Sequence, residues 1–181
     1  MLIPLGIWAA SGAGGGGAGT DFQLISTQVL GSTTASVTFS SIPSTYKHLQ
    51  VRATMVASTT GVDAPYIRYN GDTANNYTLH TLLGEGASAR TQGVANTSSI
   101  NIGGFWFGLL GSNPGVSIVD ILDYANTNKY KTLRHIGGGD KNGSGYIGLY
   151  SGVAVASTSA ISSIKLYPQA GGFAQYSHFA L

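Results

Sequence analysis

The sequence contains no cysteine and very little charge. Without cysteine it can form no disulfide, offer no thiolate to a metal and use no thiol nucleophile. Charged residues make up 9% of the chain, where about 25% is usual, so the surface must be polar but largely uncharged. The nine basic residues are scattered along the chain, whereas phosphate neutralisation needs them clustered, so we expect no nucleic-acid partner.

Carboxylates are scarce as well, with seven Asp and Glu residues in the chain. Glycoside hydrolysis needs two carboxyl groups about 5 to 10 Å apart. Asp120 and Asp123 are close in the sequence, but residues three apart in a strand point to opposite faces, so these two cannot share a site without a bulge. The sequence therefore predicts no catalytic residues, and we expect the protein not to be an enzyme.

Metal ligands are equally sparse. His48, His80, His135 and His178 are single and widely separated, which is not the spacing of a zinc site. The string Asp140–Gly145 is similar to the opening of a calcium loop, but its twelfth position is Ser151 in place of a bidentate glutamate. A plain glycine-rich turn therefore competes with calcium binding there, and we expect no metal and no cofactor.

No apolar run is long enough to cross a membrane. The apolar part of the first twenty residues, 2–10, is less than half of the roughly 20 residues that a membrane-spanning helix needs, so we expect no membrane insertion. Residues 11–19 are only Gly, Ala and Ser, a composition typical of a flexible tether. The large apolar side chains before this tether need a host surface, and we predict that they form an anchor or assembly contact: Leu2, Ile3, Leu5, Ile7 and Trp8.

Two alternatives for the first ten residues stay open. A secretory signal peptide would have a basic beginning, yet no Lys or Arg precedes Lys47. The segment could also be a first strand that packs in the core of its own domain. We take residues 1–20 as an anchor with its tether and residues 21–181 as a single domain, which is long enough to bury a real core.

The rest of the chain consists of short β-like runs separated by turn residues. Residues 47–56 alternate cleanly between apolar and polar side chains, as expected of a half-solvated strand, whereas residues 77–83 also fit a short helical turn. We expect residues 116–124 to form a central strand buried on both faces over part of its length, and residues 137–145 to form a glycine-rich loop. Further strands are expected at 22–30, 35–40, 66–69, 99–102, 105–107, 129–136, 146–156, 161–167 and 173–181.

About ten short strands with no room for crossover helices predict an all-β fold, namely an antiparallel β-sandwich or jelly roll with an extended N-terminal arm. The ten tyrosines are the most promising binding residues of such a fold, because their rings stack on sugars. Packing in the core or between subunits is the competing role for each of them. The candidates for glycan binding are Tyr66, Tyr69, Tyr77, Tyr146 and Tyr150.

Several strings of the sequence resemble a family of small virion structural proteins of tailed bacteriophages. The most specific is Ser-Ile-Pro-Ser-Thr-Tyr-Lys-His-Leu at 41–49. The others are Met-Leu-Ile-Pro-Leu-Gly at 1–6, Phe-Gln-Leu-Ile-Ser-Thr at 22–27, Tyr-Asn-Gly-Asp at 69–72, the stretch 119–131 and Leu-Tyr-Ser-Gly at 149–152. Together they extend over nearly the whole chain.

This resemblance implies a non-enzymatic protein of the virion. The leading expectation is a short tail or baseplate fibre or knob, attached to other virion proteins through its N-terminal arm, assembled as a homotrimer and in contact with a host surface glycan. A capsid decoration protein or head fibre of the same virion is the alternative. A glycan-cleaving enzyme and a free lectin are the rivals from other functional classes.

Overall fold

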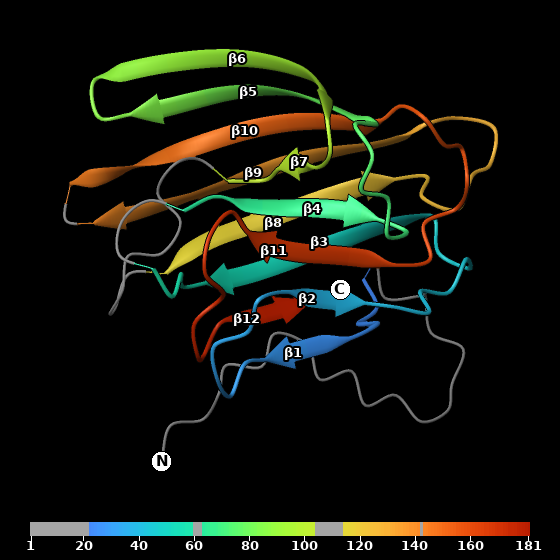
Figure 1. The fold of residues 1–181 in the computed structure, drawn as a ribbon, viewed down its shortest axis with the longest axis horizontal. Coiled ribbons are helices and arrows are strands. Elements are labelled where there is room, and N and C mark those ends of the chain that lie inside the picture. The colour runs from blue at the N-terminus through green and yellow to red at the C-terminus, as the bar shows by residue number, and fades with distance from the viewer. Residues whose placement is uncertain (1–21, 60–62, 104–113, 142) are drawn as a thin grey trace.

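Two antiparallel β-sheets face each other in the computed structural model, which describes residues 22–59, 63–103, 114–141 and 143–181 (Figure 1). The large sheet has the strand order β1-β12-β3-β8-β9-β10-β5-β6, and the small sheet has the order β2-β11-β4-β7. The expected all-β class and antiparallel sandwich are thereby confirmed. The strands are β1 (Thr27–Val29), β2 (Val37–Phe39), β3 (His48–Met55), β4 (Pro65–Tyr69), β5 (Tyr77–Glu85), β6 (Ser88–Thr97), β7 (Ile100–Asn101), β8 (Gly115–Leu122), β9 (Lys131–Lys141), β10 (Ser144–Ala154), β11 (Ile164–Pro168) and β12 (His178–Ala180).

The hydrophobic core lies between the two sheets. Alternation along β3 turns Leu49, Val51 and Ala53 inward, while the polar residues between them face out. Aromatic side chains fill the space between the layers, as where the rings of Phe173 and Phe179 pack with centroids 4.8 Å apart. Each sheet therefore has one buried face and one outer face.

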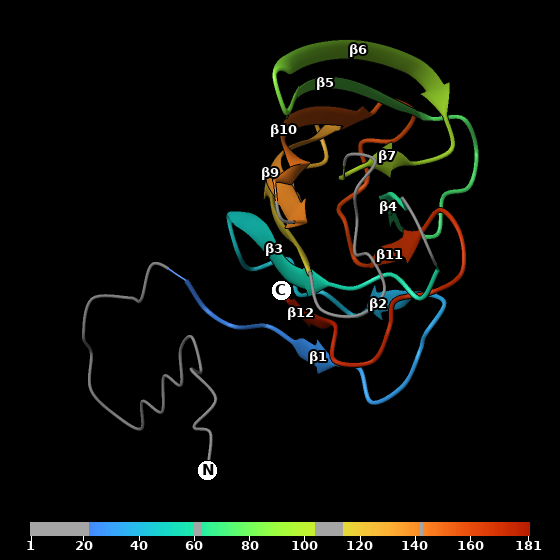
Figure 2. The same ribbon diagram turned by 90° about the vertical axis from the view of Figure 1, so that its left-hand side faces the viewer.

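Figure 2 shows the two sheets as separate layers, with the large sheet curving from β1 to β6 around the small one. A register shift between Tyr77 and Leu79 marks a bulge in the β5–β6 ladder, and bulges increase strand bending.

None of the described residues belongs to a helix of the length and apolarity that a membrane span requires.

Two predictions about the large sheet are wrong. The strand β8 is buried on one face only, since Val116, Ile118 and Leu122 point outward and are at least 36% exposed. The glycine-rich stretch after residue 136 is not a loop, because Gly137–Gly139 continue β9 and pair with β10. An apolar side chain reveals a strand but not which face is covered, and glycine carries no side chain from which alternation can be read.

The strand β6 has no counterpart among the sequence predictions. Its residues are mostly exposed and polar, and it pairs with β5 only, at the edge of the large sheet. Residues 77–83, which also fitted a helical turn, form part of β5 because this segment is hydrogen-bonded on both sides, to β6 and to β10. Hydrogen bonding to a neighbouring strand therefore determines that both segments are strands.

The terminal strands are shorter than predicted. In the stretch 22–30 only Thr27–Val29 pair with a neighbouring strand, and in 173–181 only His178–Ala180 do, whereas Phe173 forms isolated bridges to Thr34 and Ala57. The expected strand at 105–107 lies outside the described residues.

Candidate functional site

The outer face of the small sheet carries two tyrosines and two cations side by side. In the register of β4 with β11, Tyr66 pairs with Tyr167 and Arg68 pairs with Lys165. Alternation turns Ile67 and Leu166 into the core, so the other four side chains face outward. We call Tyr66, Arg68, Lys165 and Tyr167 the tyrosine platform.

The platform is a stack of rings and cations. The rings of Tyr66 and Tyr167 stack with centroids 5.6 Å apart and planes 24° apart. The guanidinium carbon of Arg68 lies 4.7 Å from the Tyr167 ring centroid, and the Lys165 ammonium nitrogen lies 5.8 Å from the same centroid. Both cations are within the range of a cation–π contact.

Hydrogen bonds fix the orientation of Arg68. Its Nε donates to the carbonyl oxygen of Ser98 at 2.8 Å, and one terminal nitrogen donates to the Ser98 hydroxyl at 3.1 Å. A guanidinium held in this way loses little further conformational freedom when it binds an anion. The platform is therefore pre-organised before any ligand arrives.

A buried carboxylate holds the chain beside the platform. Asp63 is 1% exposed, and its Oδ1 accepts backbone N–H groups from Ala64 at 2.8 Å and from Gln169 at 2.9 Å. Burial raises the pKa of Asp63, while these N–H donors act in the opposite direction. Burial, then the nearby Tyr167 and Asp63, raise the pKa of Tyr66, which keeps its phenol neutral.

Three of the five predicted glycan-binding tyrosines are instead core residues. Tyr69, Tyr77 and Tyr150 are at most 4% exposed, so none of them can stack on a sugar from solvent. Tyr69 and Tyr77 pack edge to face with centroids 6.3 Å apart, and the Tyr77 hydroxyl accepts the Tyr69 N–H at 3.2 Å. The spacing explains part of the error, because positions 66 and 69 of one strand must face opposite ways.

The other two predicted tyrosines are partly exposed but belong to different sheets. Tyr66 is in the platform on β4, whereas Tyr146 is on β10 of the large sheet. The structure therefore places Tyr66 in a candidate site and does not bring Tyr146 to it. The predicted anchor residues Leu2, Ile3, Leu5, Ile7 and Trp8 lie outside the described residues, and their role stays a prediction.

The imidazole ring of His135 is buried in the core. His135 is 3% exposed, neither of its ring nitrogens has a hydrogen-bond partner, and its ring lies 4.9 Å from that of Tyr150. Burial lowers the pKa of His135 to about 3, so the ring is neutral at physiological pH. Gly137, two residues after His135 on β9, and its cross-strand partner Gly148 on β10 leave the space that the two rings occupy.

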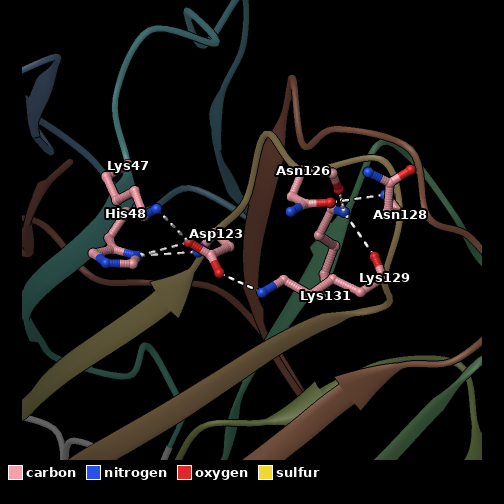
Figure 3. A network of polar contacts seen from close by, with 7 residues as sticks. All are labelled: Lys47, His48, Asp123, Asn126, Asn128, Lys129 and Lys131. Carbon is pink, nitrogen blue, oxygen red and sulfur yellow. Dashed lines mark hydrogen bonds and ion pairs between the residues drawn. The ribbon is translucent and has the colours of Figure 1, made fainter.

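The loop that follows β8 is held together by charges (Figure 3). The carboxylate of Asp123 forms ion pairs with Lys129 and, at 3.7 Å, with Lys47, and the Asp123 N–H donates to Nδ1 of His48 at 3.0 Å. The Lys129 hydrogen bond is the main cause that lowers the pKa of Asp123. Because the carboxylate is already neutralised by its neighbours, this cluster is a structural network.

The same network contains a buried lysine. Lys131 is 2% exposed, and its ammonium donates to the carbonyl oxygens of Asn126 and Lys129 (Figure 3). It also donates to the carbonyl oxygen of Thr158 at 2.9 Å. Burial lowers the pKa of Lys131. The ammonium thus ties the loop to the segment that follows β10.

The expectations that the chain binds neither zinc nor calcium stay predictions. Among the residues that the structure describes, no three His, Cys, Asp or Glu side chains gather closely enough to hold a metal ion. The calcium-like string is a hairpin end, where the Gly143 N–H donates to the Asp140 carboxylate at 3.3 Å and Gly143 has a φ of 88°.

Sequence reasoning missed Arg68, Lys165 and Tyr167. Alternation in Tyr-Ile-Arg-Tyr and Ile-Lys-Leu-Tyr-Pro could have placed each outward, because the apolar partners mark the inner face. No local pattern, however, states that β4 pairs with β11.

Comparisons of the chain with protein-family models, curated proteins and solved structures found no match. The resemblance to phage virion proteins therefore stays an expectation from the sequence strings.

Proposed function

We propose that the protein is a non-enzymatic structural protein of a tailed-bacteriophage virion that uses the tyrosine platform to contact acidic glycan on the host surface. The N-terminal arm attaches it to tail or baseplate proteins. The platform is the observation that carries the binding half of this proposal, and the sequence resemblance supports the virion half.

The platform has the chemistry of an acidic-sugar site. Arg68 and Lys165 supply two cations for a carboxylate or sulfate, and the strands of this face carry no acidic side chain to compete for them. Tyr66 and Tyr167 supply phenol hydroxyls and ring surface for the sugar itself. A neutral glycan would leave the cations unused, so the ligand class is an anionic polysaccharide.

The contacts of the carboxylates support a binding role over hydrolysis. Six of the seven Asp and Glu residues are described, Asp21 being outside, and each already accepts a hydrogen bond or an ion pair. The partners are backbone N–H groups for Asp63, Asp72 and Asp140, Arg90 for Glu85, Arg134 for Asp120 and Lys129 for Asp123. Carboxylates that are bound in this way stabilise the fold.

Glycan binding is tested with the purified full chain and host polysaccharide fractions, one acidic and one neutral. We expect Tyr167→Ala to weaken binding to the acidic fraction about tenfold, while Tyr130→Ala does not change it. Tyr130 is a matched control because it is exposed and lies outside the platform. Equal binding by both variants, or equal affinity for both fractions, would refute the glycan contact.

The virion half is tested on particles. A cryo-EM map should place the protein at the tail or baseplate, and a variant lacking residues 1–19 should fold but no longer join particles. Density on the capsid would select the decoration protein or head fibre instead. Incorporation of the truncated chain would rule out the arm as the attachment.

A further inference from the structure

The outer face of the large sheet carries an apolar stripe that is exposed in the part of the chain that the structure describes. In the register of the strands, Ile118, Ile136, Leu149 and Leu82 form one continuous cross-strand row. Val116 and Ile147 belong to the next row, and all six side chains are between 40% and 62% exposed. Their strands β8, β9, β10 and β5 are consecutive neighbours in the sheet (Figure 1).

The stripe borders a hollow. Gly138 lies between Val116 and Ile147 in the second row, and Gly84 follows Ile147. With no side chains at these glycines, a depression of about 770 Å³ opens next to the apolar residues. Soluble monomers rarely leave such a surface in water, because burying each large apolar side chain is worth about 1.5 to 3 kcal/mol.

We propose that a second copy of this chain covers this stripe. The charges of the face allow it: Arg52 is in the first row, Asp120 and Arg134 lie in the row beside it and Asp140 lies beyond the second row, so cations and carboxylates balance over the face. Arg134 already pairs with Asp120 at 2.9 Å. Two such faces attract by apolar contact without net repulsion, whereas two tyrosine platforms, each with two cations, would repel.

The size of the face also suits association between copies. Six neighbouring strands, β3 to β6 in sheet order, are spaced by about 4.8 Å, and the four outward rows from Asp120 to Asp140 are about 6.8 Å apart, which gives a flat area on the order of 650 Å². The side chains that project from the sheet add accessible surface to this flat area. For comparison, a standard interface buries about 800 Å² per partner. The platform stays on the opposite, free side of each copy.

The first described residue of each copy lies near the proposed interface. The guanidinium carbon of Arg52 lies 5.2 Å from the ring centroid of Phe22, and Arg52 pairs with Ile118 of the stripe. Each associated copy contributes one arm, and simultaneous binding of two or more arms raises overall affinity without new contacts. This consequence rests on the proposed function, but the association itself does not.

The test is the solution mass of the full chain by light scattering after gel filtration. We expect the wild type at micromolar concentration to have at least twice the mass of the 18.6 kDa chain. Leu149→Lys places a charge in the middle of the stripe, and it should weaken association at least tenfold without altering the far-UV spectrum. Val29→Lys is the matched control, since Val29 is exposed on the same sheet but at its far edge.

Three results would overturn the proposal. A monomeric wild type at 100 µM would exclude the second copy as occupant. A Leu149→Lys variant as associated as Val29→Lys would exclude the stripe. Dissociation by Leu5→Asp in the arm equal to that by Leu149→Lys would show that the arm, and not the sheet face, covers the stripe. None of these measurements involves particles or glycans, so failure here is distinct from failure of the proposed function.

Discussion

The outer faces of the two sheets differ in chemistry although both cover the same core. The small sheet presents Tyr66, Tyr167 and two cations, whereas the large sheet presents a charge-balanced apolar stripe. Fold stability requires neither composition, since both faces point away from the core. The difference is the basis of the two contacts that we propose, one with an anionic ligand and one with an apolar protein surface.

The largest expected effect separates the buried face of β8 from its outer face. Ile121→Ala, at a fully buried position, should reduce the free energy of unfolding by about 3 to 4 kcal/mol. Ile118→Ala, three residues earlier on the outer face, should reduce it by less than about 1 kcal/mol in the monomer. Urea unfolding at low protein concentration measures both. Equal losses would mean that the stripe contributes to folding and that its exposure needs no partner.

The next effect concerns His135, which adjoins the stripe residue Ile136 in sequence but points inward. Its pKa falls from 6.5 in the unfolded chain to about 3 in the fold, so the unfolded state takes up a proton first as the pH drops. Stability is full above pH 6.5 and is lost as the pH falls toward 3. His135→Leu should therefore stabilise the protein by about 2 kcal/mol at pH 5 relative to the wild type.

The control for this prediction is His80→Gln, because His80 is an exposed histidine on the outer face of the same sheet. Thermal unfolding between pH 7 and pH 4 should show a flatter curve for His135→Leu and an unchanged curve for His80→Gln. A wild-type stability independent of pH in this range would contradict the buried neutral ring.

A pair of arginine variants tests the division between the two faces. Arg68→Gln removes the fixed guanidinium of the platform and should weaken acidic-glycan binding about tenfold, with no change in solution mass. Arg134→Gln removes an arginine of the large sheet and should leave glycan binding unchanged. Binding measured by calorimetry and mass measured by light scattering give the two readouts. A loss of glycan affinity in both variants would mean that the site is not confined to the small sheet.

The smallest expected effect is the response to salt. Raising NaCl from 50 to 500 mM should weaken glycan binding by roughly two- to fivefold, because the platform acts through exposed charges. Association through the apolar stripe should not weaken over the same range. Opposite results would exchange the roles assigned to the two faces.

Much of the fold follows from local patterns. The alternation at 47–56 and at 66–69 predicts strands that the structure contains with nearly the same bounds. Where side chains carry no such pattern, as in Gly137–Gly139 of β9 or in the polar edge strand β6, the strand is specified by pairing with its neighbour. The candidate site could not be predicted for the same reason, since its residues come from two strands, β4 and β11, that pair over a long range. The predicted tyrosines at 69, 77 and 150 are buried in the core.

The amino-acid sequence was sufficient for the all-β class, the antiparallel sandwich and the inward or outward direction of most strand residues, because the alternation of side chains is a local property of the chain. The platform and the stripe are not local. Tyr66 and Tyr167 stack although about a hundred residues separate them, and the stripe needs four strands in one order and register. Contacts of this kind depend on long-range strand pairing, which the sequence of no single segment determines.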